Sequence, residues 1–342
     1  MLALAACSGE APVTTARFPA FGALTDLSLV RVGQPRAEQA AALIREDFAI
    51  LEQEWLAADG PMARVNRLLP TGEPFVAPPS ALPLIRLSQT LSARSGGRFN
   101  PATGRLTALW GFDRDDAGSR PPPDAAAIAR LAAANPQMSE IRIAGLTLQG
   151  ANPALSLDFQ SIARGAAIDL AVERLRQLGI RDAQVQVGGQ LRAIGDRSGQ
   201  PWRVPIRRAS GAGVLAVIAM RGDESMATVS AYDRSFMRNG VAYPAILDPR
   251  TGWPATAALA ATVLQRDAAS AQAAATALFV AGPESWVETA RTLGLRYALL
   301  IDTQGRVRLS PELRARIELV DTQATLVPSE PLGADPADPA KP

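Results

Sequence analysis

Helix-like and strand-like segments follow one another in an irregular order along this chain, and that order constrains its fold most. Helical spacing of apolar residues covers 37–58, 81–94, 161–178, 270–280 and 284–293. Patterns typical of strands cover 24–32, 183–187, 190–194, 202–206, 214–220, 226–230, 235–237 and 297–301. A hairpin over 141–148 turns at Gly145, and Asp124 is placed to cap a short helix that ends before Pro136. Because the order lacks strand–helix–strand regularity, it predicts an α+β fold with mixed sheets and packed helices.

The chain has no histidine, and Lys341 is the single lysine among its 35 basic residues. Ser-His-Asp triads, Cys-His dyads and histidine-ligated metal sites are therefore excluded. A phosphate-loop lysine or a Schiff-base lysine is excluded too, because Lys341 is the last residue but one of the sequence. The net charge is +2 and the arginines are scattered, so we expect no nucleic-acid partner.

Cys7 is the only cysteine, so an intramolecular disulfide is excluded. It follows Leu-Ala-Ala and precedes Ser-Gly, an order that resembles a bacterial lipobox, in which the cysteine is lipidated. We expect residues 1–7 to be a signal-peptide remnant and the protein to be lipid-anchored on the periplasmic side of a bacterial membrane. The alternative is that Cys7 is an accident of an alanine-rich segment. No apolar run reaches the ~18 residues of a membrane-spanning helix.

The remaining chain is expected to contain a linker, one folded domain and a tail. The linker covers residues 8–20, and the domain covers residues 21–318. Residues 319–342 have few apolar side chains and contain Pro328, Pro331, Pro336, Pro339 and Pro342. This composition predicts a disordered tail.

A first candidate site lies at the start of the predicted helix 161–178. Asp158 precedes this helix and Arg164 lies in its first turn. Free N–H groups at a helix N-terminus bind phosphate, and an arginine can add a bidentate contact. The segment therefore predicts a phosphate site, and the structural alternative is that Asp158 caps the helix while Arg164 is solvated.

Two further segments are candidate functional sites. Residues 248–252 read Asp-Pro-Arg-Thr-Gly, which predicts a rigid turn that is either functional or only structural. Gln272 and Thr276 lie one helical turn apart, so their oxygens share a face and could meet a hard cation. Neutral ligands alone hold Mg²⁺ poorly. Close helix packing through the neighbouring alanines is the structural alternative.

Six segments, in this order along the chain, resemble the FAD:protein FMN transferase family, also called the ApbE family. They cover 99–112, 157–169, 185–190, 227–234, 246–252 and 272–282. For example, residues 246–252 read Ile-Leu-Asp-Pro-Arg-Thr-Gly, similar to the family's Ile-Ile-Asp-Pro-Arg-Thr-Gly. The resemblance runs from about Phe21 to Ile301. It implies a single compact unit made of two intimately joined subdomains.

The resemblance implies a periplasmic lipoprotein that transfers FMN from FAD to a threonine of a target protein. It implies FAD contacts at the positions of Phe21, Ala102, Thr103, Gly104, Asp158, Arg164 and Ile246. It also implies Mg²⁺ on the diphosphate, held by a backbone carbonyl at the position of Ser161 and by the side chains at the positions of Gln272 and Thr276. We expect Asp248 and Arg250 to be the catalytic residues. The implied partners are FAD, a periplasmic flavin-acceptor protein and the membrane, the last through a lipid on Cys7.

Several residues depart from the family pattern where the chemistry is expected. The family's metal-binding aspartate is Gln272, its histidine before Ile-Ile-Asp-Pro is Ala245, and its helix lysine is Arg164. Loss of the carboxylate weakens Mg²⁺ binding, and loss of the histidine removes a candidate base. Three hypotheses follow. The chain is a divergent transferase that uses another base such as Asp248, a catalytically degenerate protein that binds flavin or a partner, or a structural lipoprotein without flavin.

Overall fold

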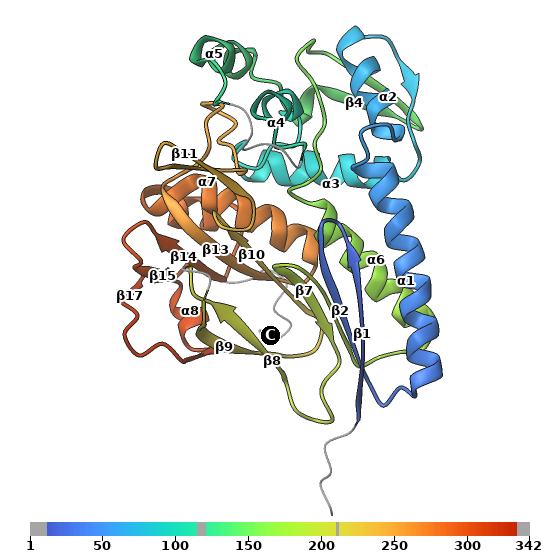
Figure 1. The fold of residues 1–342 in the computed structure, drawn as a ribbon, viewed down its shortest axis with the longest axis vertical. Coiled ribbons are helices and arrows are strands. Elements are labelled where there is room, and N and C mark those ends of the chain that lie inside the picture. Colours follow the sequence, from blue (N-terminus) through green and yellow to red (C-terminus); the bar gives the residue numbers. More distant parts are fainter. Residues whose placement is uncertain (1–11, 115–120, 210–211, 334–342) are drawn as a thin grey trace, which may run out of the picture.

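The computed structural model of the chain describes residues 12–114, 121–209 and 212–333. Within these residues, nine strands form the main sheet, in the order β1-β2-β6-β7-β10-β13-β14-β15-β17 (Figure 1). Their bounds are β1 Val13–Ala20, β2 Ala23–Val30, β6 Ala183–Val187, β7 Gln190–Ile194, β10 Glu224–Ser230, β13 Ala258–Gln265, β14 Tyr297–Asp302, β15 Val307–Leu309 and β17 Leu326–Pro328. Neighbouring strands pair antiparallel, except that β15 and β17 run parallel.

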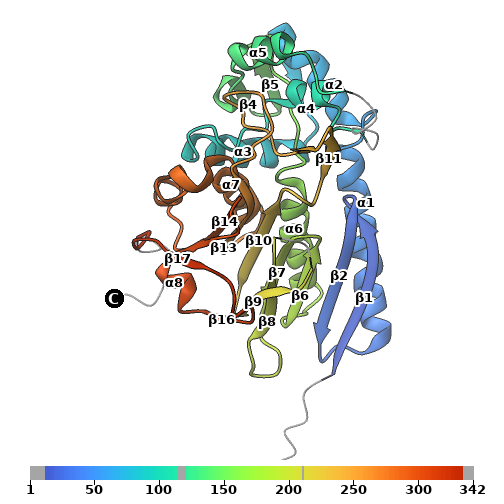
Figure 2. The same cartoon turned by 60° about the vertical axis from the view of Figure 1, so that its left-hand side comes forward.

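Three long helices cover one face of this sheet (Figures 1 and 2). Their bounds are α1 Gln34–Trp55, α6 Ala163–Gln177 and α7 Ala268–Thr292. α1 packs on β1, α6 on β6 and β7, and α7 on β10, β13 and β14. Because α7 is rich in alanine, its axis can lie close to the sheet, and nearly all of its first half is buried.

A small sheet covers the opposite face of the main sheet. It consists of β16, β9 and β8 in that order, with bounds Ile317–Leu319, Val214–Met220 and Trp202–Arg207. Buried Trp202 and Val204 of this sheet belong to one hydrophobic cluster with Leu191 and Leu264 of the main sheet. The short helix α8 (Pro311–Arg314) adds Leu313 to the same cluster.

An upper part, made mostly of the chain between α1 and α6, sits above the ends of the helices (Figure 1). It contains α2 Pro61–Leu68, α3 Ala81–Arg94, α4 Gly104–Trp110, α5 Ala125–Ala134, β3 Phe75–Val76, β4 Ile141–Ala144, β5 Thr147–Gly150, β11 Ser235–Arg238 and β12 Val241–Pro244. Met62 and Ile141 of this part share one buried cluster with Leu27 of β2 and Ile168 of α6. The two parts are therefore joined through a common core, and the predicted α+β fold is confirmed.

Several predicted elements are confirmed in detail. α3, β6 and β7 have the predicted bounds, and the hairpin of β4 and β5 turns at Gly145. The Asp124 side chain caps α5 by accepting hydrogen bonds from the N–H groups of Ala126 at 3.1 Å and Ala127 at 3.2 Å. The two helices predicted around residue 282 form α7 with a kink, because Gly282 has a φ of 65°.

The prediction of a linker over 8–20 is wrong from residue 13 onward, because β1 begins there. β1 pairs along its full length with β2, and Phe18 packs against Phe48 of α1 with ring centroids 6.1 Å apart. The segment therefore has a buried face that a linker lacks. The folded domain accordingly begins before Phe21.

The prediction of a disordered tail is wrong for residues 319–333. β16 ends at Leu319, β17 extends the main sheet, and Leu332 is buried. β17 is the last strand of the sheet, where a proline such as Pro328 leaves no ladder hydrogen bond unmade. Residues 334–342, Cys7 and the predicted remnant 1–7 lie outside the described residues. Among the described helices, none combines the length and apolar character needed to span a membrane.

Candidate functional site

A polar cavity of about 540 Å³ lies where the upper part meets the beginnings of α6 and α7. Cavities that bind small molecules typically measure roughly 300–1,000 Å³. The structure brings many of the predicted site residues to its wall, namely Phe21, Thr103, Asp158, Ser161, Arg164, Ala245, Ile246, Gln272 and Thr276. Ala102, Gly104, Asp248 and Arg250 are not among the residues that line it.

The segment before α6 is held by Asp158. Its carboxylate accepts a hydrogen bond of 2.9 Å from the N–H of Gln160, and its own N–H donates to Pro101 O at 2.8 Å. Burial raises the pKa of Asp158, and the hydrogen bond from Gln160 opposes this shift. α6 then begins at Ala163 without a side-chain cap, and the N–H groups of Ala163 and Gly165 donate within the protein, to Phe159 O at 2.8 Å and to Gln272 Oε1 at 2.8 Å. The start of the helix, with its partial positive charge, lies in the cavity wall through Ala163 and Arg164.

Arg164 joins α6 to the turn between β1 and β2. Its Nε and Nη2 donate hydrogen bonds of 3.0 and 2.9 Å to the carbonyl oxygen of Phe21. The N–H of Phe21 donates to Glu52 Oε2 of α1 at 3.1 Å. Phe21 has a φ of 52°, an uncommon conformation for a residue with a side chain, and these contacts hold it there. Burial lowers the pKa of Arg164, but a guanidinium keeps its charge at neutral pH.

Gln272 connects the beginnings of α6 and α7. It lies in the second turn of α7, where only 4% of its surface is exposed. Its Oε1 accepts a hydrogen bond of 2.8 Å from the N–H of Gly165, and its Nε2 donates to Gln160 O at 3.2 Å. One turn further, the Thr276 hydroxyl donates to Gln272 O at 3.0 Å. The two predicted ligand side chains therefore already have partners within the protein.

Of the predicted residues at 102–104, Thr103 alone reaches the cavity wall. Ala102 is fully buried and its N–H donates to Asn100 Oδ1 at 3.1 Å. The N–H of Gly104 donates to Ser156 O at 2.7 Å, and a Cβ on Gly104 would come within 2.8 Å of that oxygen. Ala102 and Gly104 therefore shape the turn that carries Thr103.

The Asp-Pro-Arg-Thr-Gly segment is a turn closed on itself. Arg250 Nη2 pairs with Asp248 Oδ2 at 2.8 Å, and this pairing raises the pKa of Arg250. Gly252 closes the turn at a φ of 73°, and its N–H donates to Asp248 O at 2.8 Å. Ile246 and Pro249 on either side of Asp248 line the cavity. The catalytic role of Asp248 and Arg250 stays a prediction.

Five charged residues that the sequence reasoning did not propose as site residues also line the cavity, namely Glu52, Arg98, Asp113, Asp233 and Arg234. Burial raises the pKa of Asp233, and the charge of Arg164 opposes this shift. Arg234 belongs to one of the six resembling segments, so the resemblance offered a signal for it. Glu52 and Arg98 reach the cavity through contacts between distant parts of the chain, which no local pattern marks.

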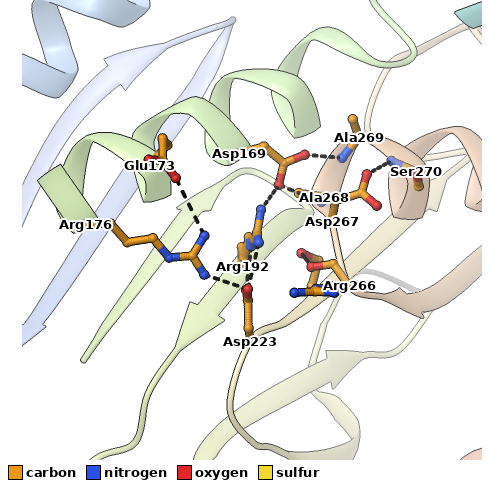
Figure 3. A network of polar contacts seen from close by, with 11 residues as sticks. Asp169, Glu173, Arg176, Arg192, Asp223, Arg266, Asp267, Ala268, Ala269 and Ser270 are labelled. Carbon is orange, nitrogen blue, oxygen red and sulfur yellow. Dashed lines mark hydrogen bonds and ion pairs between the residues drawn. The ribbon is translucent and has the colours of Figure 1, made fainter. Parts of the chain in front are cut away.

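A network of charges fixes where α7 begins (Figure 3). Asp169 of α6 accepts hydrogen bonds of 2.9 and 3.0 Å from the first two N–H groups of α7. Asp169 also pairs with Arg192 of β7 at 2.7 Å, and Arg192 pairs with Asp223 at 2.8 Å. Burial raises the pKa of Asp169. Burial acts the same way on Asp223, but hydrogen bonds from Arg192 and Arg176 outweigh it and lower the pKa of Asp223. The network ties α7, and with it Gln272, to α6 and β7.

The resemblance implies Mg²⁺ at Ser161, Gln272 and Thr276, and the contacts of these residues test that donor set. The amide of Gln272 is engaged at both ends, and the hydroxyl of Thr276 donates to a backbone oxygen. None of the three side chains carries a negative charge, which Mg²⁺ sites in proteins normally supply. Within the described ranges, no group of three or more Asp, Glu, Cys or His side chains could hold a metal ion. The residues present therefore do not fit Mg²⁺.

The fold and the cavity define the class of protein: an α+β protein in which arginines line a polar cavity at the start of a helix. A sequence model of the ApbE family matches residues 21–299, and the chain belongs to the ApbE family. It is 36% identical over 319 residues to an FAD:protein FMN transferase of Rhodobacter capsulatus, covering 92% of this chain and 60% of that protein. It is 33% identical over 317 residues to an FAD:protein FMN transferase of Treponema pallidum, covering 86% of each.

Solved structures share the fold. The apo form of the flavinyl transferase ApbE of Pseudomonas stutzeri superposes with a TM-score of 0.78 at 28% identity, covering 90% of this chain and 98% of that one. The ApbE protein of Thermotoga maritima superposes with a TM-score of 0.81 at 22% identity, covering 89% of this chain and 99% of that one. The family assignment made from the six segments is confirmed.

Proposed function

We propose that this chain binds FAD in the cavity and transfers the FMN half of FAD to a threonine of a target protein. The meeting of Asp158, Arg164 and the turn at Phe21 on one cavity wall carries the proposal. The positive end of a helix favours the negative charge of a diphosphate, and a guanidinium supplies both charge and hydrogen bonds. The names of the relatives from Rhodobacter capsulatus and Treponema pallidum support the same reaction.

The reaction is a phosphoryl transfer. The threonine oxygen forms a bond to the phosphorus of the FMN half, the bond from this phosphorus to the bridging oxygen of the diphosphate breaks, and AMP leaves with that oxygen. The hydroxyl proton passes to a base, for which we propose Asp248, oriented by Arg250. Asp233 is a second candidate, because it lines the cavity itself. Arg164 and Arg234 counter the negative charge of the diphosphate.

A transfer assay tests this function. The full chain is mixed with FAD and a peptide that contains Asp-x-Thr-Gly-Ala-Thr, the type of sequence expected in an acceptor. We expect the peptide to gain the mass of one FMN less one water and AMP to appear in equal amount, measured by mass spectrometry and chromatography. A peptide in which valine replaces the last threonine is the matched control. Tight FAD binding without either product would contradict the transfer.

A second candidate function is flavin binding without transfer. It is favoured by Ala245, which lines the cavity where the family has a histidine, and by the amide of Gln272 where the family has a carboxylate. In this case FAD stays intact on the protein. The double variant Ala245→His with Gln272→Asp is the constructive test, because a gain of transfer would show a degenerate site with an intact cavity.

We further propose that the protein is a lipoprotein on the periplasmic side of a bacterial membrane, with Cys7 as the lipidated residue and a periplasmic protein as acceptor. The lipobox-like residues around Cys7 support this proposal. Expression with a radiolabelled fatty acid tests it. Label on the wild type that disappears in Cys7→Ser is expected, and label on both or on neither would contradict the lipid anchor.

A further inference from the structure

The amide of Gln272 bridges two groups of the protein at the cavity. One group is a donor, the N–H of Gly165, and the other is an acceptor, the carbonyl oxygen of Gln160. Only one orientation of the amide satisfies both, because its oxygen accepts and its nitrogen donates. The bridge links the start of α6 to α7 across the cavity floor and leaves both of these backbone groups satisfied.

A cation at this position would have to break the bridge. Coordination through Gln272 Oε1 would compete with the 2.8 Å hydrogen bond from Gly165, whose N–H is buried against α7. A buried N–H left without a partner is costly. The Nε2 group, which points toward Gln160 O, presents hydrogens with partial positive charge and repels a cation.

From these contacts, and resting on the proposed FAD binding, we infer that this protein binds FAD without a divalent cation. The positive charge that the diphosphate needs comes from Arg98, Arg164 and Arg234, all of which line the cavity. Arg164 donates from Nε and Nη2 to Phe21, and Arg234 from Nη1 and Nη2 to Gln160 and Arg114. Since a guanidinium carries five N–H donors, each retains donors for phosphate oxygens.

The side chain of Arg98 supports the inference that arginines supply the positive charge for the diphosphate. Its Nε is buried and has no hydrogen-bond partner among the described residues, although its side chain lines the cavity. Buried polar groups are nearly always hydrogen-bonded. The Oε1 of Gln190, also in the cavity wall, is unpartnered in the same sense. The residues of the cavity wall therefore include a buried donor and a buried acceptor without a partner among the described residues, and a bound nucleotide could satisfy both after small side-chain rotations.

The isosteric variant Gln272→Glu should differ from the wild type in its dependence on a cation. A glutamate keeps an acceptor for the N–H of Gly165 but places a second carboxylate oxygen against Gln160 O, where the wild type has an N–H donor at 3.2 Å. Two oxygens facing each other repel unless a cation lies between them. The variant should therefore acquire a demand for a divalent cation that the wild type lacks.

Titration of the full chain with FAD, followed by flavin fluorescence in EDTA and in excess Mg²⁺, tests the inference. We expect the wild-type Kd to agree within about threefold between the two conditions, and that of Gln272→Glu to be at least about tenfold weaker in EDTA than in Mg²⁺. Wild-type binding that tightens about tenfold or more with Mg²⁺ would overturn the inference and leave FAD binding intact. No wild-type binding in either condition would overturn the proposed function, and the inference with it.

A second readout does not depend on FAD. Mn²⁺ binding to the apoprotein is followed by electron paramagnetic resonance, which counts the free ion. We expect no binding to the wild type beyond that of a Gln272→Leu variant, which lacks any oxygen at this side chain. Wild-type binding that the leucine variant abolishes would place a cation on Gln272 and overturn the inference.

Discussion

Arg164 lies in α6, lines the cavity and donates hydrogen bonds to the carbonyl oxygen of Phe21, so its loss should be measurable in FAD binding. A hydrogen bond from a charged donor contributes about 1.5–3 kcal/mol. We expect Arg164→Met to weaken FAD binding by about 10- to 100-fold, and Arg164→Lys by less, because lysine keeps the charge but not the paired donors. Fluorescence titration measures both. Arg67→Met, on the exposed side of α2, is the control and should leave the Kd unchanged. An unchanged Kd for Arg164→Met would contradict a role of Arg164 in FAD binding.

The pH dependence of FAD binding follows from two carboxyl groups of the cavity wall. Burial raises the pKa of Asp158 and of Asp233 above the ordinary value of 3.8, although Arg234 and Arg164 respectively oppose the shift. A diphosphate placed beside them adds negative charge and raises both pKa values further. Binding therefore takes up protons, and the Kd should increase as the pH rises through the raised values. Titrations across pH check this, and Asp233→Asn should flatten the profile; a profile that slopes the other way would contradict it.

At the scale of single residues, the cavity residues at a helix start could be predicted from the sequence, whereas charged residues that reach the cavity from distant elements could not. Asp158, Arg164 and Gln272 could be predicted because they sit at a helix start or in a resembling segment. Glu52 lies in the last turn of α1 and meets Phe21 only because β1 and β2 fold back along this helix. The bridge made by Gln272 could not be foreseen either, because it depends on the backbone of two segments more than a hundred residues away.

Among the elements, α7 depends on the network of Asp169, Arg192 and Asp223. The Arg192 side chain is 9% exposed, so its removal leaves two carboxylates without their common partner. Breaking a buried ion pair from one side costs about 3–5 kcal/mol. We expect Arg192→Met to lower the free energy of unfolding by a value at the lower end of this range, because the carboxylates are partly exposed. Urea denaturation measures the change.

The control is an exposed ion pair of the same type. Arg203 and Glu318 are 60% and 66% exposed, and pairs of this kind contribute about 0–1 kcal/mol. Arg203→Met should therefore leave the unfolding free energy nearly unchanged. If both variants lost the same unfolding free energy, the network would stabilise the protein no more than an exposed ion pair does.

The stability of the network should also depend on pH. For Asp223, whose folded pKa is lowered, the stabilisation is present above its unfolded pKa and lost as the pH falls through the folded value.

Some elements could be predicted because their two faces differ. β6 alternates buried and partly exposed side chains and was found with exact bounds. β7 could be predicted although all five of its residues are buried, because Gly188 and Gly189 mark its start. β13 was missed, because it lies inside the sheet with nearly every residue buried and shows no alternation. β1 and β17 were missed because each acquires a buried or paired side only from distant segments, namely α1 and β15.

For the molecule as a whole, the folded unit should begin at β1 rather than at Phe21. A chain that lacks residues 1–11 keeps β1, whereas one that lacks residues 1–20 loses β1, its pairing with β2 and the contact of Phe18 with Phe48. Burial of one phenylalanine alone contributes about 1.5–3 kcal/mol. We expect the shorter truncation to match the full chain in thermal unfolding and the longer one to unfold at clearly lower temperature. Equal stability of the two would restore the linker interpretation.

The direction of β1 also sets the distance between the cavity and the start of the described chain. The strand starts at the end of the molecule remote from the cavity and finishes at the turn of Phe21, which lines it (Figures 1 and 2). Its 8 residues span about 26 Å at roughly 3.3 Å per residue. With a lipid on Cys7, the membrane tether would join the molecule at the end of β1 remote from the cavity. Acceptor threonines held about this far from the bilayer would then lie within reach of the cavity.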